Sequence, residues 1–170
     1  MRLLYLHSIY KKYSMNENCS KSTDPNDDIS FLIWRIMKHW QRGKQRLLDE
    51  FGITGSQMEL LGAICYMSEH KMEATQIILS QGTEIDPMTT STILRNLQKK
   101  GLISRRESTT DTRARIVEVT KEGSALFFRA RAKMEERQEE LLKNIDKEGL
   151  IAHLQSLLTE MDRINNRLNS

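Results

Sequence analysis

The 170-residue sequence has few aromatic residues and no long apolar run. Phe, Trp and Tyr together make up 6% of the chain, whereas charged residues make up 29%. A membrane-spanning helix needs roughly 20 consecutive apolar residues, and no stretch here approaches that length. The sequence therefore predicts a soluble protein without a membrane segment. Its length fits one domain, or a small domain with long attached helices.

Cysteine is also scarce, because Cys19 and Cys65 are the only two in the chain. They form no Cys-x-x-Cys pair and have no neighbouring histidine pair, so neither a zinc site nor a disulfide framework is indicated. This usage is typical of a reduced, cytoplasmic protein. Cys65 falls on the apolar face of an expected helix, which favours a buried structural thiol, whereas Cys19 lies in a polar segment. An oxidant-sensing regulatory thiol is the alternative.

Motifs that carry catalysis are missing as well. The four histidines are scattered along the chain and form no His-x-x-x-His pair: His7, His39, His70 and His153. None lies beside a Ser or Cys in a recognisable nucleophile setting, and there is no glycine-rich phosphate loop. We therefore expect no enzymatic activity, no metal and no cofactor.

Residues 1–27 precede the first expected helix. Residues 1–14 contain a short apolar run broken by His7, without the longer apolar core and cleavage site of a secretory signal. They are an incorrectly assigned start ahead of Met15, a mobile arm, or a segment that packs on a partner subunit. Residues 16–27 are polar and turn-rich, which indicates a loop or disorder.

The first expected helix is capped by Asp27 or Asp28 and ends at Gly52. Its apolar residues recur at steps of three and four: Ile29, Leu32, Ile33, Ile36, Trp40, Leu47 and Phe51. This spacing predicts an amphipathic helix of about six turns. Its apolar stripe is longer than one small domain can cover.

Two later helices carry clear start signals. Thr54 and Gln57 fit a capping box, in which a Thr side chain and a Gln three residues later bond each other's backbone N–H groups. Asp86 is a favourable N-cap, and Pro87 occupies the first helical position, where its missing N–H costs nothing. This second helix runs to Gly101.

A short helix is expected between these two, over about Glu73–Gln81. The apolar run Ile77, Ile78 and Leu79 predicts that this helix is mostly buried. Gly82 is expected as its left-handed C-terminal residue.

A hairpin follows, with strands over 102–107 and 113–119 and a turn-rich tip over 108–112. Val117 and Val119 share one face of the second strand. The order helix, helix, turn, helix, hairpin is the winged helix-turn-helix pattern. The sequence thus predicts a mainly α fold with a two-stranded wing and long N- and C-terminal dimerisation helices.

Two more helices follow the hairpin, one capped by Thr120 and running from about Lys121 to Asn144, and one after Asp146. Both carry apolar residues along one side: Leu126, Phe127, Ala130, Met134, Leu141, Leu142 and Ile145, then Leu150, Leu154, Leu157, Leu158, Met161, Ile164 and Leu168. Self-association would bury this surface in a homodimer. An intramolecular bundle of the first and last helices is the alternative.

Positive charge is concentrated in residues 95–115. This stretch holds seven Arg or Lys residues and two acidic residues, a net charge of +5, in a chain whose total is +3. A local basic patch on a nearly neutral protein indicates phosphate binding. The exposed face of the helix after Pro87 is expected to carry donors and small hydroxyl residues suited to base edges: Thr89, Ser91, Thr92, Arg95, Asn96 and Lys99.

The hairpin adds four arginines: Arg105, Arg106, Arg113 and Arg115. An arginine at the tip of a wing can use the enhanced negative potential of a narrow minor groove. Asp111 lies two residues before Arg113 and could fix an arginine of the wing by a charge-assisted hydrogen bond. The alternatives are a solvated charged turn, and a winged-helix interaction module that no longer binds DNA.

Residues 97–123, LQKKGLISRRESTTDTRARIVEVTKEG, closely resemble the signature of the multiple-antibiotic-resistance regulators, the MarR family. Ten residues are in register: Leu97, Lys99, Lys100, Gly101, Leu102, Arg106, Asp111, Arg113, Thr120 and Gly123. Val119 replaces the usual Leu, and Gln98 replaces the usual Glu. The resemblance extends weakly over residues 29–168 and is specific only in residues 86–123.

The resemblance implies a homodimeric transcription regulator, more often a repressor, whose two winged lobes bind double-stranded DNA at a pseudo-palindromic operator. It implies that Asp111 braces the wing, that Arg113 enters the minor groove, and that Thr75 and Gln76 lie near phosphates. Arg106 and Arg115 would add positive charge. Position 95, commonly acidic in the family, is Arg here, and this departure would extend the contact with bases or phosphates.

The expected organisation has four parts. Residues 1–27 form a flexible segment and residues 28–52 a dimerisation helix. Residues 53–120 form the winged DNA-binding lobe, and residues 121–170 form C-terminal dimerisation helices.

Many members of the family respond to small aromatic ligands bound between the dimer helices and the winged lobe. The corresponding residues here are Trp34, Met37, Trp40, Met58, Cys65 and Tyr66. The alternative is that these aromatic and sulfur-containing side chains belong to the core.

Overall fold

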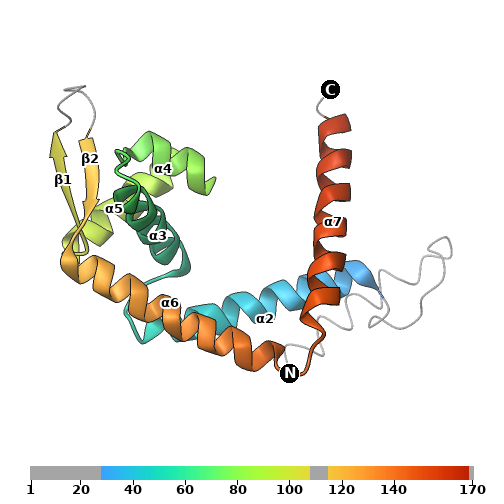
Figure 1. The fold of residues 1–170 in the computed structure, drawn as a ribbon. Helices are drawn as coiled ribbons and strands as arrows, with labels where there is room; N and C mark the ends of the chain where they lie inside the picture. The colour runs from blue at the N-terminus through green and yellow to red at the C-terminus, as the bar shows by residue number, and fades with distance from the viewer. Residues whose placement is uncertain (1–27, 108–114, 169–170) are drawn as a thin grey trace, which may run out of the picture. The chain divides into compact units, whose positions relative to one another are not determined.

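The computed structural model describes residues 28–107 and 115–168. Six helices and two strands follow one another in these residues: α2 (Ile29–Asp49), α3 (Gly55–Glu69), α4 (Gln76–Thr83), α5 (Pro87–Lys99), β1 (Ile103–Glu107), β2 (Arg115–Val119), α6 (Lys121–Leu142) and α7 (Lys147–Leu168) (Figure 1). The chain divides into two units, residues 1–43 and residues 44–170. The predicted order of elements is confirmed. No helix in these described ranges is long and apolar enough to span a membrane.

The core of the second unit forms around α3. Leu60, Leu61 and Ile64 of this helix are almost completely buried. They belong to one cluster with residues from the end of α2, from α4 and α5, and from the sheet and the residue before it: Leu47, Leu48, Leu79, Leu94, Leu97, Leu102, Ile103 and Val117. Full burial of a leucine or isoleucine side chain contributes about 1.5–3 kcal/mol. This cluster therefore fixes the short helices and the sheet as one lobe.

Local capping bonds start the helices at the predicted residues. The Thr54 hydroxyl accepts from the Gln57 N–H at 3.2 Å, and the Thr54 N–H donates to Gln57 Oε1 at 3.2 Å. Asp86 accepts from the Thr89 N–H at 2.9 Å, with Pro87 at the first position of α5. The predicted capping box and the predicted Asp86 cap are confirmed.

Helix α4 differs from its prediction in both position and burial. It begins after Thr75, three residues later than expected, and extends past Gly82 to Thr83. The left-handed residue is Glu84, with φ of 56°, so the prediction for Gly82 was wrong. Ile77 and Ile78 are 68% and 45% exposed, whereas Leu79 is buried. The expected burial is therefore confirmed for Leu79 and was wrong for Ile77 and Ile78.

A contact with β2 explains the late start of α4. The Val117 N–H donates to the Ala74 carbonyl at 2.8 Å, and Thr75 forms an isolated antiparallel bridge with Ile116. These pairings hold residues 74–75 extended beside the sheet. The helix can begin only at Gln76, where the Thr75 hydroxyl accepts from the Ile78 N–H at 3.3 Å.

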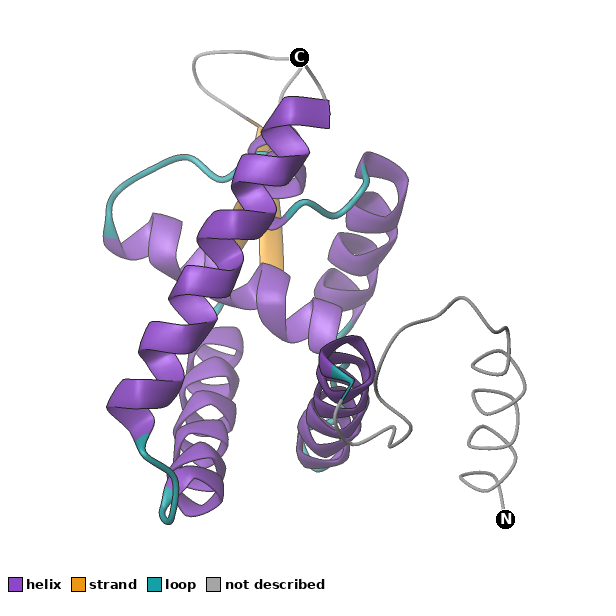
Figure 2. Cartoon of the chain, turned by 90° about the vertical axis from the view of Figure 1, so that its right-hand side faces the viewer, coloured by secondary structure: helices purple, strands orange, loops and turns teal. Residues whose placement is uncertain are grey.

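The sheet consists of β1 and β2 paired antiparallel, shown in orange in Figure 2. Ile103 pairs with Val119, Arg105 with Val117, and Glu107 with Arg115. Side chains alternate between the faces of a strand, so one face carries Arg105, Arg115 and Val117, and the other carries Arg106 and Glu118. Strand β1 is one residue shorter than predicted, because it begins after Leu102. Strand β2 agrees with the prediction over its described part, Arg115–Val119.

Candidate nucleic-acid interface

Helix α5 has one buried face and one polar exposed face. Thr90, Ile93, Leu94 and Leu97 are buried. Thr89, Thr92, Arg95, Asn96 and Lys99 are exposed, and Ser91 is half-buried. The buried Thr90 hydroxyl donates to the Ile85 carbonyl at 3.1 Å, so its polar group is satisfied inside the lobe. The predicted reading residues thus lie on the outer side of α5.

Arg95 is held along this outer side by its own helix. Its Nη2 donates to the Thr92 hydroxyl at 3.2 Å, and that hydroxyl donates to the Met88 carbonyl at 3.1 Å. Met88, in the first turn of α5, is 83% exposed. An apolar side chain at this position could contact a thymine methyl group. Met88 was not among the residues predicted to contact DNA.

Helix α4 is joined to α5 by side-chain bonds across the turn. Gln76 Nε2 donates to the Pro87 carbonyl at 3.3 Å, and the Ser80 hydroxyl donates to the Ile85 carbonyl at 2.6 Å. Thr75 and Gln76 are both half-buried. The first turn of α4 therefore lies beside the first turn of α5, as a helix-turn-helix requires.

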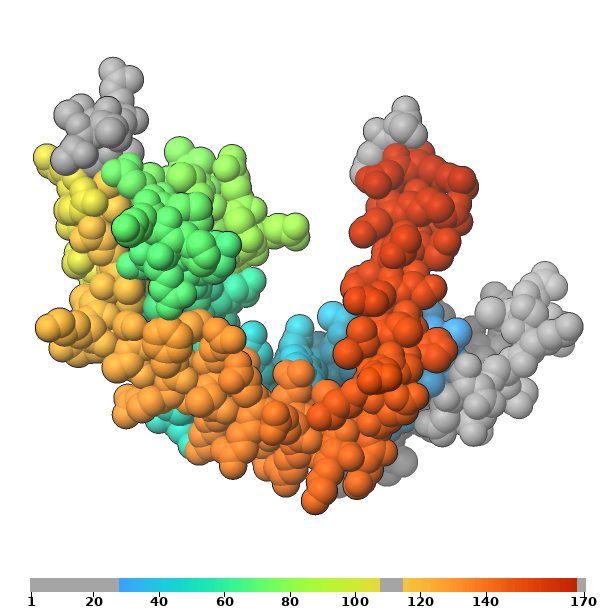
Figure 3. Space-filling model, viewed as in Figure 1, coloured from blue at the N-terminus to red at the C-terminus, as the bar shows by residue number. Residues whose placement is uncertain are grey.

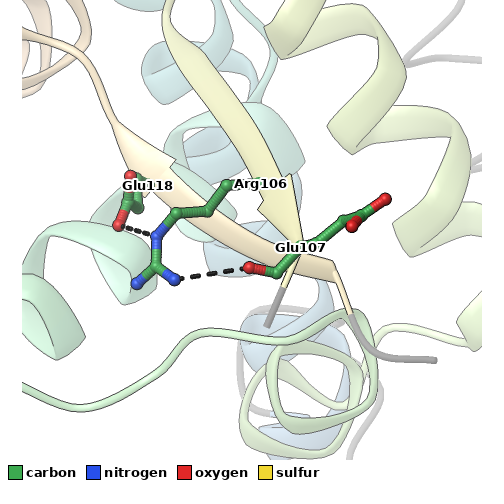
Figure 4. Close-up of polar contacts among 3 residues, drawn as sticks. All are labelled: Arg106, Glu107 and Glu118. Atoms are coloured by element: carbon green, nitrogen blue, oxygen red, sulfur yellow. Dashed lines mark hydrogen bonds and ion pairs between the residues drawn. The ribbon is translucent and has the colours of Figure 1, made fainter. Parts of the chain in front are cut away.

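Arg106 on the wing is paired with an acid. Its Nε lies 2.6 Å from Glu118 Oε1, and its Nη1 donates to the Glu107 carbonyl at 3.5 Å (Figure 4). Both side chains of the ion pair are about half exposed, so the pair adds little stability. The pair does reduce the positive charge that Arg106 offers to a phosphate.

Arg105 occupies the opposite face of the sheet and has different surroundings. Together with Arg115 it lines a cleft of about 290 Å³ whose other walls are Thr75, Gln76, Ile77, Leu94 and Val117. Burial lowers the pKa of the Arg105 guanidinium, and the charges of Arg115 and Arg95 lower it further. Arg105 was expected to be one of the wing charges, but it was not predicted as a contact residue.

Lys100 forms two hydrogen bonds inside the lobe. Its Nζ donates to the Gly52 carbonyl and, at 3.0 Å, to Gln57 Oε1. These bonds connect the end of α5 to the start of α3. The Lys100 ammonium is therefore hydrogen-bonded within the lobe, and it does not belong to the exposed basic face of α5.

Asp111 and Arg113, predicted for the wing, and Cys19 lie outside the described residues. The predicted effector-site residues are described, and they have different surroundings. Met58 and Cys65 are buried in the lobe, and burial followed by the charge of Glu69 raises the pKa of Cys65 to about 11. Tyr66 is exposed and its ring lies 4.1 Å from that of His70.

Trp34, Met37 and Trp40 lie on the part of α2 that belongs to the first unit. The ring centroid of Trp34 is 5.8 Å from that of Phe31. Met37 and Trp40 are exposed, and Trp34 is half-buried. The six predicted effector-site residues are thus divided between the two units.

Three helices, a two-stranded wing and an outward basic helix face define a winged helix-turn-helix protein. The sequence model described as transcriptional regulator SarA/Rot matches residues 42–129. YdcH of Bacillus subtilis (strain 168), described as an uncharacterized HTH-type transcriptional regulator, is 31% identical over 140 residues, which cover 82% of this chain and 95% of YdcH. The chain therefore belongs to the SarA/Rot transcriptional regulators, a family of regulators and not of enzymes.

Two solved structures show the same fold. A complex of S. aureus MepR with DNA has a TM-score of 0.68 and 23% identity, covering 81% of this chain and 99% of that chain. Wild-type MarR from E. coli has a TM-score of 0.63 and 23% identity, covering 79% of this chain and 96% of that chain. The resemblance to MarR-family winged helix-turn-helix regulators is confirmed.

Proposed function

We propose that this regulator is a cytoplasmic repressor that binds a pseudo-palindromic operator as a homodimer. The observation that carries the proposal is the outer face of α5. It presents Arg95, Asn96 and Lys99 beside small hydroxyl residues, with the first turn of α4 next to it. Arg and Asn side chains have the donor geometry for guanine and adenine edges in the major groove. Thr75 and Gln76 would then meet the adjoining backbone phosphates.

Helix α7 supports the homodimer part of the proposal. An apolar stripe at helical spacing runs along it, and every member is exposed in the single chain: Ile151, Leu154, Leu157, Leu158, Met161 and Ile164. Figure 3 shows side chains of this helix, in red, at the surface of the viewed face. Exposed apolar stripes of this length mark association surfaces. A second copy of the chain would bring its own stripe to this surface.

Genomic selection with the purified full-length protein tests the proposal. We expect enrichment of sites with two inverted half-sites roughly one helical turn apart, near 10 base pairs between their centres. In transcription reactions on a promoter that carries such a site, adding the protein should lower transcript yield. A fragment with one half-site scrambled is the matched control. Selected sites without inverted symmetry would contradict the dimeric operator, and increased transcription would contradict repression.

An interaction module that has lost DNA binding is the rival function. The two are separated by the salt dependence of binding to the selected fragment. Lys and Arg contacts to phosphates release counterions, so the affinity of a true DNA-binding lobe falls steeply as salt rises. A shallow slope, or no enrichment at all, would favour the interaction module.

Release of the operator by a small aromatic effector is a further part of the proposal, and it rests on the family resemblance. Among the predicted lining residues, Met37, Trp40 and Tyr66 have exposed side chains, whereas Met58 and Cys65 belong to the core. The test concerns Trp40 of the first unit. Aromatic carboxylic acids and phenols, added to the protein–operator complex, provide the test. We expect a ligand that releases the operator to lose its effect in Trp40→Ala. Undiminished release in that variant would contradict the proposed site.

A further inference from the structure

The Arg105 guanidinium is buried in part without a hydrogen-bond partner. Among the described residues, neither its Nε nor its Nη2 has a hydrogen-bond partner. Native proteins leave few buried polar atoms unpaired, because an unpaired buried donor costs free energy, and a charged one costs more. A hydrogen-bond acceptor from a bound ligand would satisfy these two donors of Arg105.

The surroundings of Arg105 specify the charge of that ligand. Burial lowers its pKa, and the neighbouring charges that lower it further, Arg115 and Arg95, are both positive. The remaining walls of the cleft include the apolar side chains Ile77, Leu94 and Val117. Two acids lie on the described part of the wing. Glu118 bonds Arg106 on the other face of the sheet, and Glu107, opposite Arg115 on the face of Arg105, forms no ion pair with either arginine. An anion is the group that would satisfy both the open donors and the excess positive charge.

We propose that the cleft between α4, α5 and the wing is an oxyanion site, in which Arg105 and Arg115 bind a backbone phosphate of the operator. This inference rests on the proposed function. An arginine presents its donors in a planar fork that matches two phosphate oxygens, and such charge-assisted bonds are short and strong. Thr75 and Gln76 at the first turn of α4 border the same cleft. A phosphate held there would fix the wing and α4 to one strand of the duplex.

If Arg105 binds a phosphate, its replacement should lower DNA affinity without lowering the stability of the protein. In Arg105→Met the apolar stem is retained and the unpaired cation is removed, so the melting temperature should stay unchanged or rise. DNA affinity should fall by about tenfold or more, and the slope of log affinity against log salt should decrease by about one for each phosphate that the variant can no longer bind. Arg105→Lys should keep the salt slope and lose part of the affinity, because it retains the charge without the fork.

Arg131→Met is the matched control. Arg131 is an exposed α6 arginine paired with Glu135, and it lies outside the cleft. This variant removes the same formal charge and should bind the selected operator like the parent chain. Equal affinity and slope in Arg105→Met and the parent chain would overturn the oxyanion site while leaving the proposed DNA-binding function intact. So would equal reductions of affinity in Arg105→Met and Arg131→Met.

A second arm distinguishes phosphodiester from free oxyanions. The melting temperature of the DNA-free protein is measured in inorganic phosphate and in chloride at equal ionic strength. Phosphate should raise it in the parent chain and not in Arg105→Met, because only the native cleft binds the ion. A rise of equal size in both would overturn the site. If phosphate acts through Arg105 but operator affinity does not depend on this residue, the DNA backbone is excluded as the ligand.

Discussion

The basic residues of the stretch 95–115 have different surroundings in the folded protein. Lys100 bonds the Gly52 carbonyl and Gln57, and Arg106 pairs with Glu118. Arg95 and Lys99 lie on the outer face of α5, and Arg105 borders a cleft with Arg115. A count of charges in the sequence treats all of these as equivalent. At the residue scale, the partner of each cation decides how much charge it offers to DNA.

Arg113→Ala should weaken operator binding by at least about tenfold at moderate salt while the protein stays folded. The reason is the predicted insertion of Arg113 into the minor groove, where the negative potential is enhanced. Arg106→Ala should weaken binding by a smaller factor, because Glu118 already offsets that charge. Fluorescence anisotropy with the selected operator measures both. Unchanged affinity in Arg113→Ala would contradict the wing assignment.

Cys65 should make stability fall at alkaline pH. Burial and Glu69 raise its pKa to about 11 from an ordinary value of 9.0, so the folded protein retains the thiol proton after the unfolded chain has lost it. The free energy of unfolding should therefore decrease as pH rises from about 9 to about 11. Urea unfolding of the parent chain and of Cys65→Ala across that range measures the effect. The same pH slope in both would contradict it.

At the element scale, the family signature has a physical basis in the junction between α5, the wing and α6. The Thr120 hydroxyl donates to the Gly101 carbonyl at 2.7 Å and accepts from the Gly123 N–H at 3.0 Å. The Thr120 N–H donates to the Leu102 carbonyl at 3.1 Å. Gly101 has φ of +69°, which favours glycine. These few residues return the chain from the wing and start α6 at a fixed place.

Gly123→Ala should destabilise the protein by about 1–3 kcal/mol, as overpacking in a tight contact does. A Cβ atom at this position would collide with the Leu102 carbonyl oxygen and lie 3.1 Å from Val119 Cγ2. Gly82→Ala in α4 is the matched control, because nothing lies within 4 Å of its Cβ position. That variant should be neutral or stabilising by up to about 1 kcal/mol. Equal denaturation midpoints for the two variants would contradict this account.

At the scale of the whole molecule, association through α7 would complete the fold. Residues 151–167 of this helix are all exposed in the single chain. Burial of this apolar stripe against a second copy would remove it from water, which favours association. DNA binding and association are then coupled, because a symmetric operator needs two lobes at fixed spacing.

If the proposed dimer forms through α7, Leu154→Glu together with Leu158→Glu should convert it to a monomer, since two charges would replace apolar side chains of the stripe. Sedimentation or light scattering measures the mass. Operator affinity should fall with it by at least about tenfold, because a single lobe contacts one half-site. Ser156→Glu, on the opposite side of the helix, adds charge outside the stripe and should leave the mass unchanged. If the double variant remained dimeric, the dimer interface would not involve this stripe of α7.

Local sequence was sufficient to predict the element order, the helix starts at Thr54, Asp86 and Thr120, and the family. Capping bonds join residues three positions apart, and the signature residues are contiguous, so this information is local. The buried face of α4, the partner of Arg106 and the cleft at Arg105 emerge only in the folded chain. They depend on residues 74–75 pairing with β2 and on the register that places Arg105 opposite Val117. Such long-range pairings produce no periodic pattern in the sequence, so they cannot be predicted from it.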